Sequence, residues 1–365
     1  MRRTRLSPEV FSLPVDQLRR GYYSDAYFNT AKAVLERHDL HRRVVMQVFQ
    51  KRPRAVLGGM DEALAVLKVA TGSLAGSGPG AAWRPGWEDL VVSALCDGDE
   101  VVAYETVLTI EGDYSLFAHL ETVYLGVLTR RTLISTNVRE VVEAAHGKPI
   151  LFFPARFDHY RVQTGDGYAA HVAGAIGVST EAQASWWGGK GIGTVPHGLI
   201  AACGGDTVEA SRRFADLYHP DFNVVALVDF DNDCVGTSVA CAGALGERLW
   251  GVRLDTSETM VDRSLWDRMG TFKPTGVAPE LVWEVRRALD AAGHGRVKIV
   301  VSGGFDAGKI AAFEAAGVPA DAYGVGSSLL RGNTDFTADV VMVEGQPCAK
   351  AGRGVVANPR LERVV

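Results

Sequence analysis

The sequence predicts an α/β protein in which a parallel, (β/α) barrel-like domain is joined to an additional β-rich α+β domain. In the second half of the chain, short apolar runs alternate with longer stretches of helical pattern, which is typical of βα units in a parallel sheet. The number of these units and their single direction favour a closed or nearly closed barrel. No GxGxxG motif opens a helix after the first run, which argues against a dinucleotide-binding fold.

The first third of the chain has a different pattern. Residues 21–37 begin with a turn and continue as an amphipathic helix, and strand-like runs follow between about 43 and 110 around a helix near 61–70. A late strand-like stretch at 337–345 is expected to rejoin this part of the protein. We therefore expect a β-rich domain from residues 1–113 and 335–365, bridging helices at 114–145, and the barrel-like domain at 146–334.

Composition restricts the class of protein. The chain has 365 residues, of which 47% are hydrophobic and 22% charged, and its net charge is −5. Nothing in the overall charge favours a nucleic-acid partner, and no apolar run approaches the roughly 20 residues of a membrane-spanning helix. The first ten residues are charged without a following hydrophobic stretch, so we expect no signal peptide and a cytoplasmic protein. The five cysteines form no CxxC pair, which predicts free thiols and no structural metal site.

Polar side chains follow the predicted barrel strands at the points where those strands end. In α/β barrels this is the face that carries the chemistry. Arginine binds carboxylate or phosphate groups in a bidentate manner, so two arginines here indicate a substrate with more than one negative group. An aspartate near phosphate commonly holds Mg²⁺ or a pair of ribose hydroxyls. The residues concerned are Arg156, Thr194, His197, Asp229, Asp231, Arg253 and Asp255.

Two glycine turns follow the last two predicted strands. The run 297–301 reads as a buried strand, Ser302-Gly303-Gly304 as a turn, and 306–316 as a helix capped by Asp306. A similar arrangement recurs in DAYGVGSSLL at 321–330. A strand, a glycine turn and a helix N-terminus together bind anions well, and two in succession are typical of the phosphate site of α/β barrels.

Each of these features also has a purely structural explanation. The glycine pairs can be tight corners, and Arg253 and Asp255 can pair with neighbouring strands. Asp229 can cap the following helix, and His197 can be a hydrogen-bonded core histidine. The convergence of five strand ends on one face is what favours a functional site.

Several motifs together resemble nicotinate phosphoribosyltransferase, a member of the type II phosphoribosyltransferase family. The resemblance covers most of the chain and follows the order of the family's motifs. The motifs are SDAYFNTAKAVLE (24–36), HLETVYLGVL (119–128), FFPAR (152–156), GIGTVPHGLI (191–200), VRLDT (252–256), VSGGFD (301–306), YGVGSSL (323–329) and CAKAGR (348–353).

The resemblance implies a reaction. Nicotinate and 5-phosphoribosyl 1-diphosphate would give nicotinate mononucleotide and pyrophosphate in NAD salvage, with Mg²⁺ and with ATP as a coupled co-substrate. It also implies a homodimer or larger homo-oligomer with shared sites, with no nucleic-acid or membrane partner. A transfer through an oxocarbenium-like state needs no Ser-His-Asp or Cys-His arrangement, and none is evident.

The resemblance also implies residue roles at the base. Tyr27 would stack on the pyridine ring from the partner subunit, and Phe153 would cover the other face. Arg253 would bind the nicotinate carboxylate with help from Thr194, while Asp255 would lie near the ribose or base.

Further implied roles concern phosphate. Arg156 would hold the diphosphate, and His197 would be the histidine that ATP phosphorylates, with Asp229 beside it among the catalytic groups. The 5′-phosphate would be held by the two glycine turns, that is, by Ser302, Gly303, Gly304, Gly324, Gly326 and Ser327.

The chain departs from the family pattern at Ile176, where an aspartate is usual, at Phe230 in place of threonine, and at Pro154 in place of glycine. Alternative functions are quinolinate or nicotinamide phosphoribosyltransferase, a sugar-phosphate barrel lyase or isomerase, or, in view of the Ile176 departure, a non-catalytic nucleotide sensor. A lyase of this kind would usually need a Schiff-base lysine, and neither Lys190, Lys298 nor Lys309 stands at a strand end.

Overall fold

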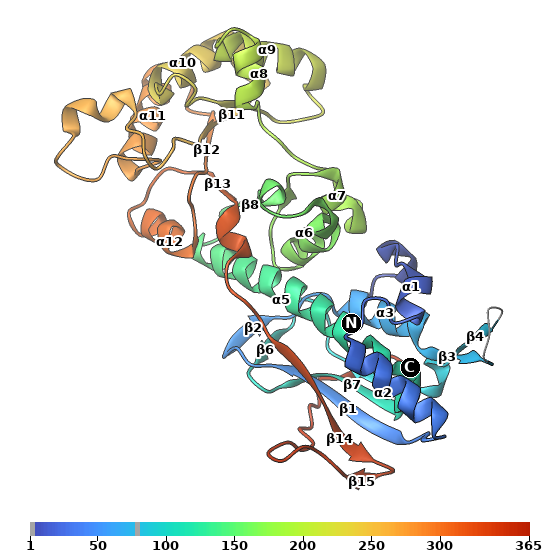
Figure 1. The fold of residues 1–365 in the computed structure, drawn as a ribbon. Helices are drawn as coiled ribbons and strands as arrows, with labels where there is room; N and C mark the ends of the chain where they lie inside the picture. The colour runs from blue at the N-terminus through green and yellow to red at the C-terminus, as the bar shows by residue number, and fades with distance from the viewer. Residues whose placement is uncertain (1–3, 77–80) are drawn as a thin grey trace. The chain divides into compact units, whose positions relative to one another are not determined.

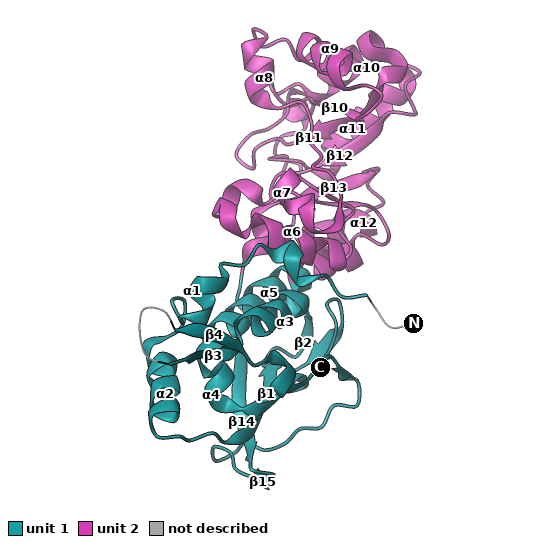
Figure 2. Cartoon of the chain, turned by 90° about the vertical axis from the view of Figure 1, so that its right-hand side faces the viewer, with its two compact units in different colours: residues 1–136, 332–365 teal, residues 137–331 magenta. Residues whose placement is uncertain are grey.

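The computed structural model describes residues 4–76 and 81–365. The expectation of no signal peptide rests partly on residues 1–3, which lie outside the described residues. The chain divides into two compact units, unit 1 (residues 1–136 and 332–365) and unit 2 (residues 137–331), which Figures 1 and 2 show. The division falls within the long helix α5, Glu121–Ala144, inside the region expected to bridge the domains. The predicted class, a β-rich domain together with a barrel-like parallel domain, is confirmed.

Unit 1 is built on a six-stranded antiparallel sheet with the strand order β15-β14-β1-β7-β5-β16. Strand β14, Phe336–Val343, pairs with β1, Arg43–Gln50, so the late strand-like stretch does rejoin the N-terminal part. The remaining strands of unit 1 are β2 (Arg54–Val56), β3 (Gly72–Ala75), β4 (Ala82–Pro85), β5 (Val91–Ala94), β6 (Glu100–Val102), β7 (Thr106–Asp113), β15 (Gln346–Pro347) and β16 (Glu362–Arg363).

The helices of unit 1 cover this sheet with apolar side chains. Met60 and Leu67 of α3 and Tyr124 of α5 are fully buried against sheet residues such as Val48 and Ile110. The predicted helix near 61–70 is confirmed as α3. The helices of unit 1 are η1 (Pro8–Phe11), α1 (Val15–Arg19), α2 (Ala26–Arg37), α3 (Met60–Ala70), η2 (Trp87–Asp89), α4 (Tyr114–Phe117) and η3 (Ala118–Leu120), followed by α5.

Unit 2 contains a parallel six-stranded sheet with the order β10-β11-β12-β13-β8-β9. Its strands read as apolar runs because helices cover them, and all four residues of β10 and of β13 are buried. The strands are β8 (Ile150–Phe152), β9 (Gly177–Val178), β10 (Val224–Leu227), β11 (Leu249–Leu254), β12 (Lys298–Val301) and β13 (Ala322–Val325).

The segment 191–195 connects the two edge strands of this sheet. Gly191 forms a parallel bridge with Val178 of β9, and Ile192 N donates to Val178 O at 2.8 Å. On the other side, Val195 N donates to Val225 O of β10 at 3.1 Å. The sequence predicts a strand here, but the segment is extended without being a regular strand, because alternate glycines interrupt its pairing. The sheet is thereby bonded around into a barrel-like arrangement.

The helices of unit 2 follow the strands in alternation. The predicted helix at 306–316 is confirmed as α12, where Asp306 Oδ1 accepts from Lys309 N at 2.9 Å. The helices are η4 (Ala155–Phe157), η5 (Tyr160–Val162), α6 (Gln163–Val172), α7 (Glu181–Ala184), η6 (Ser185–Trp187), α8 (His197–Ala202), α9 (Thr207–Tyr218), α10 (Cys234–Leu245), η7 (Gly246–Arg248), η8 (Arg263–Arg268), α11 (Pro279–Ala291), α12 (Ala307–Ala315) and η9 (Ser327–Leu330).

Candidate active site

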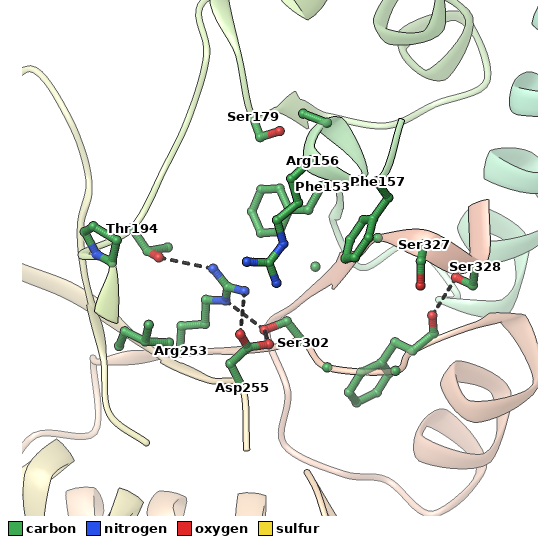
Figure 3. Close-up of a pocket in the computed structure, with 18 of the residues that line it drawn as sticks. Phe153, Arg156, Phe157, Ser179, Thr194, Arg253, Asp255, Ser302, Ser327 and Ser328 are labelled. Carbon is green, nitrogen blue, oxygen red and sulfur yellow. Dashed lines mark hydrogen bonds and ion pairs between the residues drawn. The ribbon is translucent and has the colours of Figure 1, made fainter. Parts of the chain in front are cut away.

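Unit 2 has a cavity of about 680 Å³ at the carboxyl ends of its parallel strands. This is the face at which the sequence places the chemistry. Twelve of the candidate site residues from the sequence analysis line the cavity, and Figure 3 shows many of them converging on it. These are Phe153, Arg156, Thr194, His197, Arg253, Asp255, Ser302, Gly303, Gly304, Gly324, Gly326 and Ser327.

Arg253, on β11, is held by three neighbouring side chains. Its Nε donates to Ser302 Oγ at 2.7 Å, its Nη1 donates to Thr194 Oγ1 at 3.3 Å, and its Nη2 lies 3.1 Å from Asp255 Oδ2 (Figure 3). Ser302 in turn donates to Asp255 Oδ1 at 2.7 Å. Parallel pairing of β11 with its neighbour β12 brings these strand ends together. The guanidinium group is therefore fixed in orientation before any ligand binds.

Phe153 completes this corner of the cavity. The Arg253 guanidinium carbon lies 5.2 Å from the centroid of the Phe153 ring, within cation–π range. The Phe153 backbone is tied to β13, because its N donates to Val325 O at 2.8 Å. An aromatic ring beside a fixed guanidinium suits a flat aromatic ligand that carries an anionic group.

The first glycine turn lies at the end of β12. Gly303 has φ of 84° and Gly304 of 68°, in the left-handed region that favours glycine. Helix α12 begins three residues later, so its N-terminal N–H groups and this turn border the same space. The arrangement is suited to a phosphate group.

At the second glycine turn, glycine is required by close approach. A Cβ on Gly324 would lie 2.8 Å from Phe153 Cε2, and one on Gly326 would lie 3.0 Å from Phe157 Cε2. Only a residue without a side chain therefore allows β13 to pass beneath the two rings. Ser327 follows as the first residue of η9 and lines the cavity.

Two further arginines face the cavity. Arg156, on η4, has its guanidinium carbon 5.2 Å from the Phe157 ring centroid, and Arg331 follows η9. Within residues 4–76 and 81–365, neither forms an ion pair with a carboxylate. Both are therefore free to bind an anionic ligand.

His197 stands at the start of α8, at the junction of two cavities. Its Nε2 lies 3.0 Å from Asp229 Oδ1, and its side chain is 47% exposed. Burial raises the pKa of Asp229, the His197 contact acts in the opposite direction, and the Asp255 carboxylate raises it again. Asp229 does not line the main cavity. Together with His197 and Phe230, whose ring lies 6.2 Å from the imidazole, it lines a neighbouring cavity of about 330 Å³.

Tyr27 belongs to unit 1, on α2, and does not line this cavity of unit 2. Its side chain is 64% exposed, and its ring centroid lies 4.3 Å from that of Phe28. The departure from the family pattern at Ile176 is a side chain that is 69% exposed. Pro154 directly precedes η4 and so helps to set the position of Arg156.

The cavity also contains residues that the sequence analysis did not select. Phe157 and Arg331 lie just beyond recognised motifs, while Ser179 and Glu258 stand on loops after β9 and β11. Their proximity to quoted motifs was the only signal available, because loop residues beyond a strand end have no periodic pattern.

Metal ligands are few. In the described part of the chain, no group of three or more His, Cys, Asp or Glu side chains is placed to hold a metal ion. Cys203, Cys234, Cys241 and Cys348 are free thiols. A search of the described helices finds none with the length and hydrophobicity needed to cross a bilayer.

A barrel-like parallel domain with two glycine turns at its mouth, together with a β-rich domain, is the architecture that the resemblance to type II phosphoribosyltransferases led us to expect. Residues 25–132 match the family model described as "Quinolinate phosphoribosyl transferase, N-terminal domain". The structure of nicotinate-nucleotide pyrophosphorylase from Pyrococcus furiosus is 32% identical, with a TM-score of 0.77 over 100% of this chain and 86% of that one. The chain belongs to the type II phosphoribosyltransferase family.

The chain is also similar to proteins named nicotinate phosphoribosyltransferase. Nicotinate phosphoribosyltransferase of Mycobacterium tuberculosis is 30% identical over 268 residues, which are 71% of this chain and 55% of that protein. The chain thus spans about half the length of the curated relatives it matches. Human nicotinic acid phosphoribosyltransferase shares the fold, with a TM-score of 0.65 at 16% identity over 91% of this chain and 77% of that one.

Proposed function

We propose that this protein transfers the phosphoribosyl group of 5-phosphoribosyl 1-diphosphate to nicotinate, giving nicotinate mononucleotide and pyrophosphate for NAD salvage. The observation that carries the proposal is the fixed Arg253 guanidinium beside the Phe153 ring, a few residues from two glycine turns. This corner offers one carboxylate site and one ring face. The glycine turns offer a separate phosphate site on the same wall of the cavity.

The chemistry follows from these positions. The nicotinate ring nitrogen would be directed at the anomeric carbon by Arg253, which binds the carboxylate at the meta position of the ring, and by Phe153, which holds the ring plane. The 5′-phosphate would be anchored at Gly303 and Gly304. Because both reactants are held, the attack becomes effectively intramolecular, and the main further requirement is to stabilise the departing diphosphate. Arg156, a cation without an ion-pair partner among the described residues, is positioned to do this.

Mg²⁺ fits this cavity as an ion that comes with the substrate. Mg²⁺ is usually bound through one or two carboxylates together with phosphates and water, so the absence of a three-ligand cluster among the described residues is compatible with it. Asp255 would be the carboxylate that contacts its coordination shell. When bound, the ion would neutralise charge on the leaving diphosphate.

ATP coupling is part of the same proposal. His197 is half exposed between the two cavities and contacts Asp229 through Nε2. A neutral imidazole nitrogen can accept a phosphoryl group near neutral pH, with the carboxylate holding the ring in place. Incubation with γ-labelled ATP should leave acid-labile, base-stable label on the protein. Absence of label while ATP is being hydrolysed would contradict this part of the proposal.

Assembly is proposed as a homodimer or larger homo-oligomer with shared sites. The support is Tyr27, an exposed ring in unit 1 that matches the family's stacking tyrosine. Light scattering at assay concentration tests this. A fully active monomer would rule out shared sites.

Quinolinate is the second candidate acceptor. Two observations favour it: the cavity has two arginines without carboxylate partners in addition to Arg253, and the N-terminal match carries the quinolinate name. Quinolinate has two carboxylates and would use the extra charge.

One experiment separates the candidates. The purified protein is mixed with 5-phosphoribosyl 1-diphosphate, Mg²⁺ and one pyridine at a time, either nicotinate, nicotinamide or quinolinate, and the product is identified by mass. We expect nicotinate mononucleotide from nicotinate at the highest rate. Product formed only from quinolinate would move the assignment to the second candidate, and no product with any pyridine would refute the transferase proposal.

A further inference from the structure

A carboxylate lies against the first glycine turn. A Cβ on Gly304 would collide with Glu258 Oε1, and one on Gly303 would lie 3.4 Å from Asp255 Oδ1. Asp255 is already neutralised by Arg253, whereas Glu258 has no ion pair within 4.0 Å among the described residues. A negative charge at this place opposes the binding of a phosphate dianion, because like charges a few ångströms apart repel each other.

Glu258 can leave this place without unfolding of its loop. The loop after β11 is closed at its base, where Gly276 N donates to Met260 O at 2.8 Å and Val261 forms a bridge with Thr275. These bonds fix the backbone on the C-terminal side of Glu258. The Glu258 side chain itself is exposed, so a change of rotamer moves the carboxylate into water at little cost.

A cation also contacts this turn. Lys309 Nζ donates to Gly303 O at 3.3 Å and lies 4.2 Å from the centroid of the Phe305 ring. Burial lowers the pKa of Lys309, and the nearby Glu258 and Asp306 carboxylates act against that shift. The ammonium group is thus partly desolvated, and nearby negative charge favours its protonated form.

We propose that Glu258 is a gate on the phosphate turn: its carboxylate occupies the turn in the free protein, and the 5′-phosphate of the substrate displaces it. The inference rests on the proposed function, since it takes this turn as the 5′-phosphate site. The incoming phosphate takes over from Glu258 as counter-charge for Lys309. A negative charge therefore lies beside Lys309 both in the free protein and in the phosphate-bound protein. Sugars with little negative charge would displace Glu258 poorly.

The test is the affinity for 5-phosphoribosyl 1-diphosphate, measured by titration calorimetry with and without Mg²⁺. Glu258→Gln keeps the shape of the side chain and removes its charge, and Glu258→Ala removes both. We expect each variant to bind about fivefold more tightly than the unaltered protein, the size of effect expected for one partly exposed charge. The KM for nicotinate should not change, because the ring site lies at Arg253.

The matched control is Glu247→Gln. Glu247 is 91% exposed on η7, before β11 and thus at the opposite end of that strand, and should leave the affinity unchanged. Equal affinity in all proteins, or weaker binding by the Glu258 variants with or without Mg²⁺, would overturn the gate. Failure of the unaltered protein to bind 5-phosphoribosyl 1-diphosphate at all would instead refute the proposed function, so the two failures are distinguishable.

Discussion

Two corners of the same cavity are built in opposite ways. At the Arg253 corner, each nitrogen of the guanidinium group has one partner, and the side chain is only 19% exposed. At the His197 corner, the imidazole has one hydrogen-bond partner among the described residues, Asp229, and is 47% exposed. The first corner is held in one orientation before a ligand arrives but still has N–H groups to offer an anion, and the second is open on two sides.

This difference indicates that the two corners have different functions. A fixed and partly desolvated guanidinium group discriminates strongly between ligands with and without an anion, because leaving it unmatched carries a cost. A half-exposed imidazole discriminates weakly but can be reached by a phosphoryl donor. We therefore assign recognition of the nicotinate carboxylate to the Arg253 corner and coupling to ATP hydrolysis to the His197 corner.

The largest expected effect comes from removing the charge of the Arg253 corner. Arg253→Met should lower kcat/KM for nicotinate by roughly 10²- to 10³-fold, the usual cost of breaking a buried, hydrogen-bonded charge pair. Arg213→Met, on the exposed side of α9 and 67% exposed, is the control and should leave the kinetics unchanged. A loss of less than tenfold in a variant with an unaltered melting temperature would remove Arg253 from its recognition role.

A smaller loss of activity is expected from a substitution that disturbs the packing of Phe153 at the same corner. Gly324→Ala places a Cβ 2.8 Å from Phe153 Cε2 and should push the ring away from Arg253. We expect about a 10- to 30-fold loss in kcat/KM and a lower melting temperature, since overpacking typically costs about 1–3 kcal/mol.

The control for this change is Gly243→Ala in α10, where a Cβ would meet nothing within 4 Å. Alanine at a helical position should leave activity unchanged and raise the melting temperature slightly. If Gly324→Ala behaves like Gly243→Ala, the Phe153 ring does not need its present position.

The His197 corner should respond differently to substitution. His197→Ala should abolish ATP hydrolysis that depends on substrate, while a slow transfer without ATP remains at a rate reduced by about tenfold or less. The physical reason is that Arg253 and the glycine turns still position both reactants. If the variant loses transfer equally with and without ATP, His197 acts on the diphosphate and not as a phosphoryl acceptor.

The smallest effect concerns pH. Burial raises the pKa of Asp229 above its ordinary value of 3.8, so the folded chain binds this proton more readily than the unfolded chain. This titration should make the free energy of unfolding fall as pH rises from about 4 toward neutrality, and Asp229→Asn should remove that contribution.

The measurement is the free energy of unfolding in urea as a function of pH, compared between His197→Ala and His197→Ala/Asp229→Asn. The two proteins differ only in the Asp229 carboxylate, and both lack its His197 partner. Parallel pH profiles for the two proteins would show that Asp229 is no harder to ionise in the folded state than in the unfolded chain.

Much of the Arg253 corner could be predicted from sequence, because parallel strands bring their carboxyl ends together whatever the loops do. Arg253, Asp255 and Ser302 are adjacent for this reason. The apolar runs of β10, β12 and β13 also identified the barrel-like sheet correctly. The prediction of a strand at 191–195 was wrong. This segment is extended but is not a regular strand, because its glycines interrupt the pairing.

The remaining parts of the site depend on loops. Glu258 reaches the Gly304 turn only because the loop after β11 folds back and is closed at Gly276. Arg331 lies beyond η9, and no pattern in the sequence signals that it faces the cavity. The contact of His197 with Asp229 joins residues 32 positions apart and depends on the path of α8. Such contacts are set by tertiary structure and not by local periodicity.

The most direct test of the account compares nicotinate with nicotinamide in the unaltered protein. The two acceptors differ only in the carboxylate that Arg253 is positioned to bind, so kcat/KM is measured for each with saturating 5-phosphoribosyl 1-diphosphate and Mg²⁺. We expect nicotinate to be preferred by at least about 10²-fold, because the amide would leave the guanidinium group unmatched. Equal kcat/KM for the acid and the amide would contradict the account.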